Sequence, residues 1–178
     1  MKCLTVTSHH GDYRVAAHPG AVSGLGPVLD SEGIAWPRSV VSNITVAPLW
    51  AETAARSLDT PLIELADGEE NKRWPTVEDL LGRWLDVGLH RGDTVVAVGG
   101  GVLTDTVGFA AAVYLRGISW IAVPTTLLAM VDASGGGKTG VNLEHGKNLV
   151  GAFWPPQLVV VDVDTRATLP VRELQAGL

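Results

Sequence analysis

Residues Thr94 to Val98 form a continuous run of β-branched and small apolar side chains that leads directly into three glycines, Gly99 to Gly101. Such a run is typical of a central strand buried on both faces of a parallel sheet, and the glycines indicate a tight turn at its carboxyl end. Ligands bind at these strand ends in open α/β sheets. The segment therefore predicts a mostly parallel, Rossmann-like α/β fold with a binding site at this edge.

Apolar runs alternate with longer amphipathic segments along the rest of the chain, as expected of βα units. One amphipathic segment, 75–89, has apolar residues at three- and four-residue spacings. We expect further helices at 21–29, at 106–115 and from an N-cap at Asn43 to Leu58. We expect strands at 13–17, 39–42, 61–66, 94–98, 120–123 and 158–163.

The composition fits a folded protein and excludes several classes. The 178 residues are 46% hydrophobic and 18% charged, and the net charge of -6 argues against a nucleic-acid partner. The single cysteine, Cys3, excludes an internal disulfide and favours a cytoplasmic location. Arg116 and Pro124 divide the most apolar stretch, 107–131, so we expect two buried elements there and no membrane partner.

The glycine turn and the residues after it, 99–105, have the features of an anion site. Glycines let the backbone approach a pyrophosphate closely, and the N–H groups at a helix start favour an anion. The pattern departs from the Gly-x-Gly-x-x-Gly fingerprint because Thr104 stands at the last glycine. A tight turn without a ligand is the alternative interpretation of this segment alone.

A second glycine-rich segment, 134–140, contains Gly137-Lys138-Thr139, as in a phosphate-binding P-loop. A P-loop needs a glycine where Asp132 stands, so we exclude an ATPase or GTPase. What remains is a predicted glycine-bounded loop with two lysines, Lys138 and Lys147, and the amide of Asn148. These donors suit a phosphorylated, polyhydroxylated substrate, and a solvated loop is the alternative.

The polar run 67–72 follows a predicted strand, where carboxylates can bind ribose hydroxyls; a simple polar turn is the alternative. The five histidines show no metal-ligand spacing, and we predict no metal site within this chain. No Gly-x-Ser-x-Gly motif supports a serine hydrolase.

Taken together, these segments resemble the 3-dehydroquinate synthase family of sugar-phosphate cyclases. The matching segments are 99–112 (GGGVLTDTVGFAAA), 123–132 (VPTTLLAMVD), 136–142 (GGKTGVN) and 146–153 (GKNLVGAF), with support from 42–49, 67–69 and 169–178. The match covers nearly the whole chain. Gly135 departs from the family, which has a larger residue there, and we expect it to loosen the loop.

The resemblance implies a domain at 1–170 that binds NAD and a helical domain that begins at 171–178 and supplies ligands for zinc or cobalt. Those ligands lie beyond Leu178 in the family, so the chain alone is expected to be inactive and truncated. Asn43 is implied near the adenosine end of NAD. The other implied NAD-site residues are Asp67, Gly68, Glu69, Glu70, Asn71, Lys72, Gly99, Gly100, Gly101, Val102, Leu103, Thr104, Asp105, Thr125, Thr126, Lys138, Lys147, Thr165, Arg166, Ala167 and Thr168.

The family's reaction uses NAD as a recycled catalyst that turns 3-deoxy-D-arabino-heptulosonate 7-phosphate into 3-dehydroquinate and phosphate, in the shikimate pathway. The resemblance implies that Asp132, Lys138, Lys147, Asn148 and Arg116 face this phosphorylated sugar acid, with Arg116 reaching the phosphate from the neighbouring subunit of a homodimer. Two alternatives stay open. One is a secondary-metabolism cyclase making aminodehydroquinate, 2-epi-5-epi-valiolone or 2-deoxy-scyllo-inosose, and the other is an NAD-binding module without chemistry.

Overall fold

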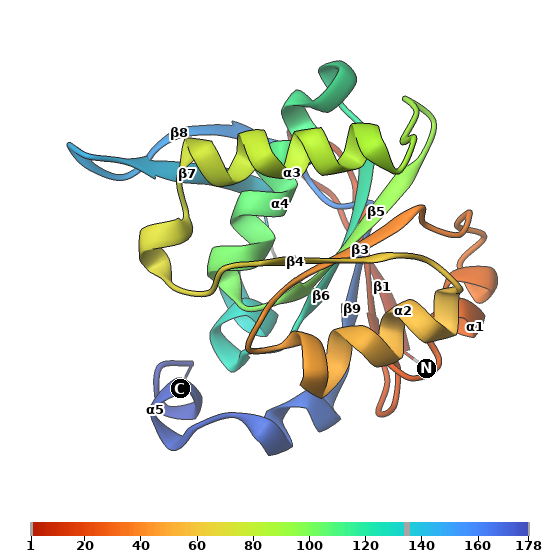
Figure 1. Ribbon diagram of the computed structural model, residues 1–178. Helices are drawn as coiled ribbons and strands as arrows, with labels where there is room; N and C mark the ends of the chain where they lie inside the picture. Colours follow the sequence, from red (N-terminus) through yellow and green to blue (C-terminus); the bar gives the residue numbers. More distant parts are fainter. Residues whose placement is uncertain (1, 134–135, 178) are drawn as a thin grey trace.

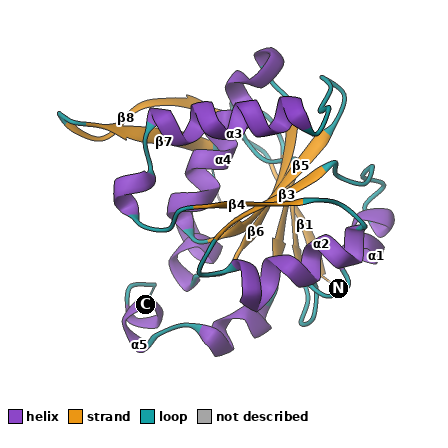
Figure 2. Ribbon diagram, in the orientation of Figure 1, coloured by secondary structure: helices purple, strands orange, loops and turns teal. Residues whose placement is uncertain are grey.

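A seven-stranded sheet forms the centre of the part of the chain described by this computed structural model, residues 2–133 and 136–177 (Figures 1 and 2). Six of its strands are parallel, and only β1 runs antiparallel, against β2. The mostly parallel α/β fold expected from the sequence is therefore confirmed. In spatial order the strands are β1 (Lys2–Val6), β2 (Tyr13–Ala17), β9 (Leu158–Val161), β6 (Ser119–Pro124), β5 (Thr94–Gly99), β3 (Ser39–Asn43) and β4 (Leu62–Leu65).

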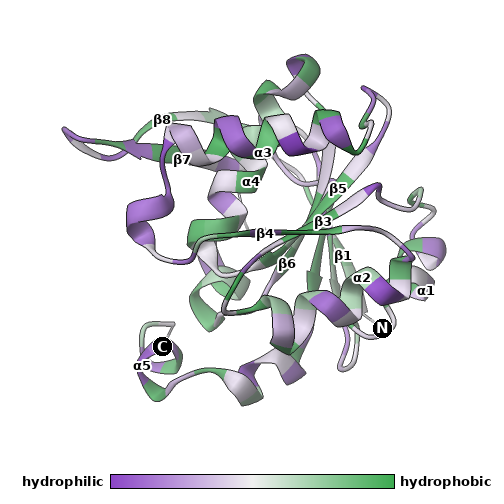
Figure 3. Ribbon diagram, in the orientation of Figure 1, coloured by the Kyte–Doolittle hydropathy of each residue, from purple (hydrophilic) through white to green (hydrophobic). Residues whose placement is uncertain are grey.

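Helices cover both faces of this sheet (Figure 1). On one face, α1 (Leu25–Ser31) and α2 (Glu52–Leu58) pack in a cluster with Val96 and Val98 of β5. On the other face, α3 (Trp74–Asp86) and α4 (Gly101–Val113) pack in a cluster with Val95 and Ala97. The pleat sends alternate residues of the β5 run to opposite cores, which explains why the whole run is apolar. Figure 3 shows the hydrophobic residues gathered in these strands.

The connections reverse direction between β3 and β5, which are neighbours in the sheet. The chain leaves β3 toward β4 through α2 on one face, and it leaves β5 toward β6 through α4 on the other face. Such a reversal opens a crevice at the carboxyl ends of the two strands, because their connections diverge. The fold therefore places a binding crevice between the end of β3 and the glycine turn after β5.

The segment that we predicted as a glycine-bounded loop is a β-hairpin, and that prediction was wrong. β7 (Lys138–Leu143) pairs antiparallel with β8 (Gly146–Phe153) as a separate two-stranded sheet. The hairpin lies over α4 and extends beyond the main sheet (Figure 1). Its glycines serve close packing, since Cα of Gly140 would lie 3.1 Å from a Cβ added to Gly151. The lysines are therefore held on strands.

Several element boundaries also differ from the sequence expectations. The helix expected at 106–115 begins at Gly101, because the glycine turn passes directly into its first turn. The helix expected from Asn43 to Leu58 is a π-helical turn, Ala47–Ala51, with Pro48 in its first turn, followed by α2. The helix expected at 21–29 begins only at Leu25. β1 was not expected, and the prediction about Gly135 lies outside the described residues.

Three short 3-10 helices lie in connecting segments: Glu69–Asn71, Tyr114–Arg116 and Val163–Thr168. A π-helical turn, Ala129–Ala133, follows β6, and α5 (Val171–Gln175) lies near the carboxyl end of the chain. Within the described residues, no helix has both the length and the apolar character needed to cross a membrane.

Gly108 lies at a close contact between α4 and the hairpin. A Cβ added to Gly108 would lie 2.6 Å from Cγ2 of Thr139 and 2.8 Å from a ring carbon of Trp120. We expect Gly108→Ala to lower the free energy of unfolding by about 1 to 3 kcal/mol, because the added methyl overpacks this contact. Urea unfolding followed by circular dichroism measures the change.

The matched control is Gly82→Ala in α3, where an added Cβ would meet no atom within 4 Å. In a helix interior this substitution stabilises by about 0.5 to 1 kcal/mol, since alanine loses less backbone entropy. Opposite signs for the two variants are expected. A stabilising Gly108→Ala would contradict the packing described above.

Candidate functional site

The carboxyl edge of the parallel sheet gathers the segments that the sequence predicted for a nucleotide. Asn43 ends β3, and residues 67–72 follow β4. The glycine turn follows β5, Thr125 and Thr126 follow β6, and residues 165–168 follow β9. Because these strands are parallel, their carboxyl ends lie at one edge. The structure therefore brings all five predicted segments to the same side of the sheet.

Asn43 and Asp67 join the ends of β3 and β4. Nδ2 of Asn43 donates to Oδ1 of Asp67 at 2.9 Å, and Oδ1 of Asn43 accepts from the Val46 amide at 2.8 Å. Oδ1 of Asp67 also accepts from the Gly68 amide. These bonds fix both side chains beside a small crevice, lined by Asn43, Leu65, Ala66, Asp67, Asn71, Thr76, Val102, Leu103 and Thr106. The crevice lies at the reversal between β3 and β5.

The glycine turn presents unpaired polar groups at the start of α4. The first helical hydrogen bond runs from the Thr104 amide to the Gly100 carbonyl, so the preceding amides have no partner within the helix. A Cβ on Gly100 would lie 3.0 Å from Cγ2 of Thr126. Oγ1 of the buried Thr125 has no hydrogen-bond partner among the described residues. A glycine cradle, free amides and an unpaired hydroxyl fit the pyrophosphate of a dinucleotide.

Residues 165–168 contribute differently from the other predicted segments. The buried Thr165 donates its hydroxyl to the Asp162 carbonyl at 2.8 Å, and Thr168 donates to the Thr165 carbonyl at 3.0 Å. Nε1 of Trp50 donates to Oγ1 of Thr168 at 2.8 Å. These hydroxyls stabilise the short helix after β9 and attach it to the turn before α2. Arg166 and Ala167 are exposed there.

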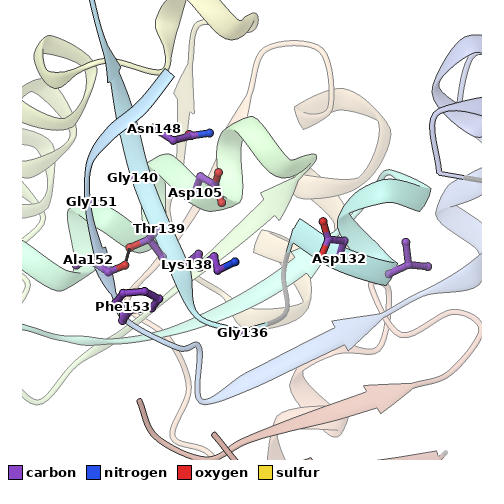
Figure 4. A pocket seen from close by; sticks show the side chains of 11 residues that line it. Asp105, Asp132, Gly136, Lys138, Thr139, Gly140, Asn148, Gly151, Ala152 and Phe153 are labelled. Atoms are coloured by element: carbon purple, nitrogen blue, oxygen red, sulfur yellow. Dashed lines mark hydrogen bonds between the residues drawn. The ribbon is translucent and has the colours of Figure 1, made fainter. Parts of the chain in front are cut away.

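A larger cavity of about 720 Å³ opens between α4, the hairpin and the turn after β6 (Figure 4). Four predicted site residues line it: Lys138 on β7, Asp132, Asn148 and Asp105. Figure 4 shows Lys138 pointing toward the side of the cavity where Asp132 lies. The remaining lining residues were not predicted as site residues: Val131, Gly136, Thr139, Gly140, Gly151, Ala152 and Phe153. In the sequence, these residues are marked only by their place in the matching segments 123–132, 136–142 and 146–153.

Lys72 is a buried cation between the two predicted sites. Lys72 is only 5% exposed. Its Nζ lies 2.5 Å from Oδ2 of Asp105 and 2.6 Å from Oδ1 of Asn148. Burial raises the pKa of Asp105, although the hydrogen bond and charge of Lys72 act in the opposite direction. Lys72 therefore joins the run after β4 to Asp105, near the start of α4, and to the hairpin. Sequence reasoning assigned it only to the nucleotide.

Glu69 and Lys147 form a more exposed contact above this buried pair. Nζ of Lys147 lies 3.4 Å from Oε1 of Glu69, and Nδ2 of Asn142 donates to the same oxygen at 2.7 Å. Partial burial acts to raise the pKa of Glu69, but the bonds from Asn142 and Lys147 and the charge of Lys72 outweigh it and lower the pKa. Lys147 is not among the residues that line the larger cavity.

Arg116 does not reach the cavity within this chain. It follows α4, which begins at the carboxyl end of β5 and runs about 20 Å back to the amino end of β6. Leu115 and Arg116 have φ values of 49° and 69°, in the left-handed region that non-glycine residues rarely adopt. Arg116 is exposed at the edge of the sheet opposite the candidate site.

No group of three His, Cys, Asp or Glu side chains within residues 2–133 and 136–177 could hold a metal ion. A metal of the kind that the resemblance implies therefore has no ligand cluster in the described part of the chain.

We expect Lys72→Met to lower the free energy of unfolding by about 2 kcal/mol at pH 7.5, because it leaves the largely buried Asp105 carboxylate without its cation. Loss of Lys72 raises the pKa of Asp105 further. A carboxyl with a raised pKa stabilises the fold below its unfolded pKa and loses that contribution as pH rises. The deficit should therefore shrink toward pH 4.5, as urea unfolding at both pH values can measure.

Lys147→Met is the matched control, because its side chain is 71% exposed and its partner lies 3.4 Å away. Its expected cost is below about 0.5 kcal/mol at either pH. Equal losses for the two variants would show that burial of Lys72 does not decide the stability of this contact.

Comparison with known proteins places these features in a family. The family model described as 3-dehydroquinate synthase N-terminal matches residues 62–176. The 3-dehydroquinate synthases of Pelotomaculum thermopropionicum and Geobacter metallireducens are 45% and 47% identical to the chain over its whole length. The chain covers 49% and 51% of them, so it spans about half the length of the curated relatives it matches.

Solved structures of related cyclases share the fold. A 2-deoxy-scyllo-inosose synthase complexed with carbaglucose-6-phosphate, NAD+ and Co2+ has a TM-score of 0.87 and 30% identity over 99% of this chain and 49% of its own. The 2-epi-5-epi-valiolone synthase of Streptomyces hygroscopicus, with NAD+ and Zn2+ bound, has a TM-score of 0.84 and 34% identity over the same shares. Because the family model spans well over half of the residues, this chain belongs to the 3-dehydroquinate synthase family and matches its N-terminal half.

Proposed function

We propose that this chain is the NAD-binding part of a 3-dehydroquinate synthase. The observation that carries the proposal is the adjacency of two sites at one edge of the sheet, a glycine cradle for a dinucleotide and a cavity lined by Lys138, Asp132 and Asp105. Relatives with this name are 44 to 47% identical over the whole chain, whereas the two solved cyclases of other specificity described above are 30 and 34% identical. This difference favours the shikimate-pathway substrate.

NAD would lie across the crevice at the ends of β3 and β5. The free amides at the start of α4 would receive its pyrophosphate, since they carry the positive end of the helix dipole. Asp67 would accept hydrogen bonds from ribose hydroxyls, with Asn43 toward the adenosine. When bound, NAD accepts a hydride from a ring alcohol and later returns it. The chain's own residues must hold the reacting carbon close to the cofactor.

The substrate, a phosphorylated sugar acid, would occupy the larger cavity. Oxidation of a ring hydroxyl acidifies the adjacent C–H, and the phosphate can then leave. Lys138 would stabilise the negative charge that develops on the oxygen of the oxidised carbon when the adjacent C–H loses its proton, because a fixed cation in a partly enclosed cavity acts strongly on such a charge. Asp132 would orient the hydroxyls from the opposite wall. Lys72 would keep Asn148 and Asp105 in place.

Arg116, the metal and residues 171–178 would act outside the described cavity. Arg116 would bind the substrate phosphate of a neighbouring subunit in a homodimer, in line with its place at the far edge of the sheet. Zinc or cobalt would need ligands that do not form a cluster among the described residues, and no step is assigned to it on this chain. Residues 171–178 would begin the second domain, and the enzyme would be cytoplasmic.

Product analysis tests the proposed reaction. The chain is joined to the second half of the Geobacter metallireducens relative and incubated with NAD+, Zn2+ and 3-deoxy-D-arabino-heptulosonate 7-phosphate. We expect 3-dehydroquinate and free phosphate, and we expect Lys138→Met to lower kcat by about a hundredfold. Arg56→Met, an exposed cation on α2, is the control expected to retain activity.

Other outcomes of this experiment point to the alternatives. A cyclitol formed only from sedoheptulose 7-phosphate would assign the chain to a related secondary-metabolism cyclase. NAD+ binding without any product from either sugar would favour a binding module.

Cofactor binding is tested separately, on the chain itself. We expect Asp67→Ala to weaken NAD+ binding at least about tenfold, since a charged acceptor of ribose hydrogen bonds is lost. Isothermal titration calorimetry measures the dissociation constant. Asp86→Ala, an exposed carboxylate at the end of α3, is the control and should bind NAD+ as the wild type does. Unchanged binding by Asp67→Ala would remove Asp67 from the proposed cofactor site.

A further inference from the structure

The hairpin contains a bulge at the point where its predicted site residues lie. The ladder pairs Val141 with Val150 and then Leu143 with Gly146. Asn142 alone therefore faces the three residues 147–149 of the other strand. Bulges of this kind turn side chains away from the regular alternation and occur beside active sites. Asn148 has a φ of 56°, so the backbone adopts a left-handed conformation within the bulge.

Asn142 makes three hydrogen bonds, two to the run after β4 and one to the opposite strand of the bulge. Its amide donates to the Lys72 carbonyl at 2.8 Å, and its Nδ2 donates to Oε1 of Glu69 at 2.7 Å. Its Oδ1 accepts from the Asn148 amide at 2.8 Å. Donor and acceptor of one side chain are thus committed to two different segments. Neither isosteric replacement, aspartate or leucine, can make both side-chain bonds at neutral pH.

Two further contacts close this arrangement into a network. Nζ of Lys72 donates to Oδ1 of Asn148, and Lys147 lies beside Glu69. Asn142 itself is not among the residues that line the larger cavity. Its partners on one side, Glu69 and Lys72, belong to the proposed cofactor segment. Its partner on the other side, Asn148, lines the proposed substrate cavity.

This inference rests on the function proposed above. We propose that Asn142 is a positioning residue that couples the binding of NAD at the run of Glu69 and Lys72 to the binding of the phosphorylated substrate beside Asn148. A ligand that fixes Glu69 also fixes Asn142 through their hydrogen bond. Asn142 in turn accepts from the Asn148 amide and so holds the backbone of Asn148 in its left-handed conformation. The second ligand then meets a bulge that is already ordered and binds more tightly.

The test measures NAD+ binding by titration calorimetry, with the chain extended to the length of its relatives. Each titration is run without and with one probe, the heptulosonate phosphate that lacks the ring hydroxyl to be oxidised. In the wild type we expect this analogue to tighten NAD+ binding about fivefold or more. In Asn142→Asp the NAD+ dissociation constants measured without and with the analogue should be nearly equal, a ratio of about one. Aspartate keeps the acceptor for the Asn148 amide but repels Glu69.

A reciprocal exchange separates coupling from damage to the fold. The double variant Glu69→Gln, Asn142→Asp exchanges donor and acceptor, so that the glutamine at position 69 donates to the aspartate at position 142. The analogue should therefore again tighten NAD+ binding, although by less than in the wild type. Glu69→Gln alone gives the reference value. Glu144→Gln, in the exposed turn of the same hairpin, should keep the wild-type ratio. Thermal unfolding of each variant shows whether it is folded at the temperature of the titration.

A second readout uses the chain alone and needs only NAD+. Hydrogen exchange at the Asn148 amide should slow when NAD+ binds to the wild type and should not respond in Asn142→Leu. Absence of NAD+ binding by the wild type would overturn both the proposed function and this inference. Binding of both ligands with the same ratio in the wild type and Asn142→Asp would overturn the role of Asn142 alone.

Discussion

The burial of β5 on both faces is the constraint on which the rest of the structure depends. A strand with no solvent-facing side must be covered by helices on each face, so its connections and those of its neighbours have to diverge. The divergence occurs between β3 and β5, and the crevice beyond their carboxyl ends follows from it. The glycines at the end of β5 and the polar ends of β3 and β4 are placed together for this reason, although far apart in sequence.

Lys72 shows a second constraint, the free energy needed to bury a charge. An ammonium group removed from water must be paired and hydrogen-bonded, and here a carboxylate of α4 and an amide of β8 supply the partners. Because those partners belong to different elements, satisfying one charge fixes the hairpin relative to α4. Asp105 and Asn148 also line the larger cavity. Stability of the contact and geometry of the cavity are therefore consequences of a single buried cation.

The sequence predicted the layers of this fold better than its irregular parts. The run at 94–98 is the clearest case, because four of its five residues are β-branched and all five are buried. The hairpin was missed because glycines at 140 and 151 signal flexibility in isolation, whereas they permit close strand contact in the structure. The contacts of Lys72 with Asn148 and of Asn142 with Glu69 join residues that are 76 and 73 positions apart, which no local pattern encodes. The approach of Gly108 to Thr139 belongs to the same class.

The charge distribution explains why the candidate site needs fixed local donors. With a net charge of -6, the chain as a whole does not attract an anionic ligand, so attraction has to arise at short range. Lys72 contributes little to it, because Asp105 neutralises its charge within the same contact. Other sources on this edge include the exposed Lys138 and Lys147 and the free amides at the start of α4. Each is attached to a strand or a helix rather than to a free loop, which limits the ordering entropy that opposes binding.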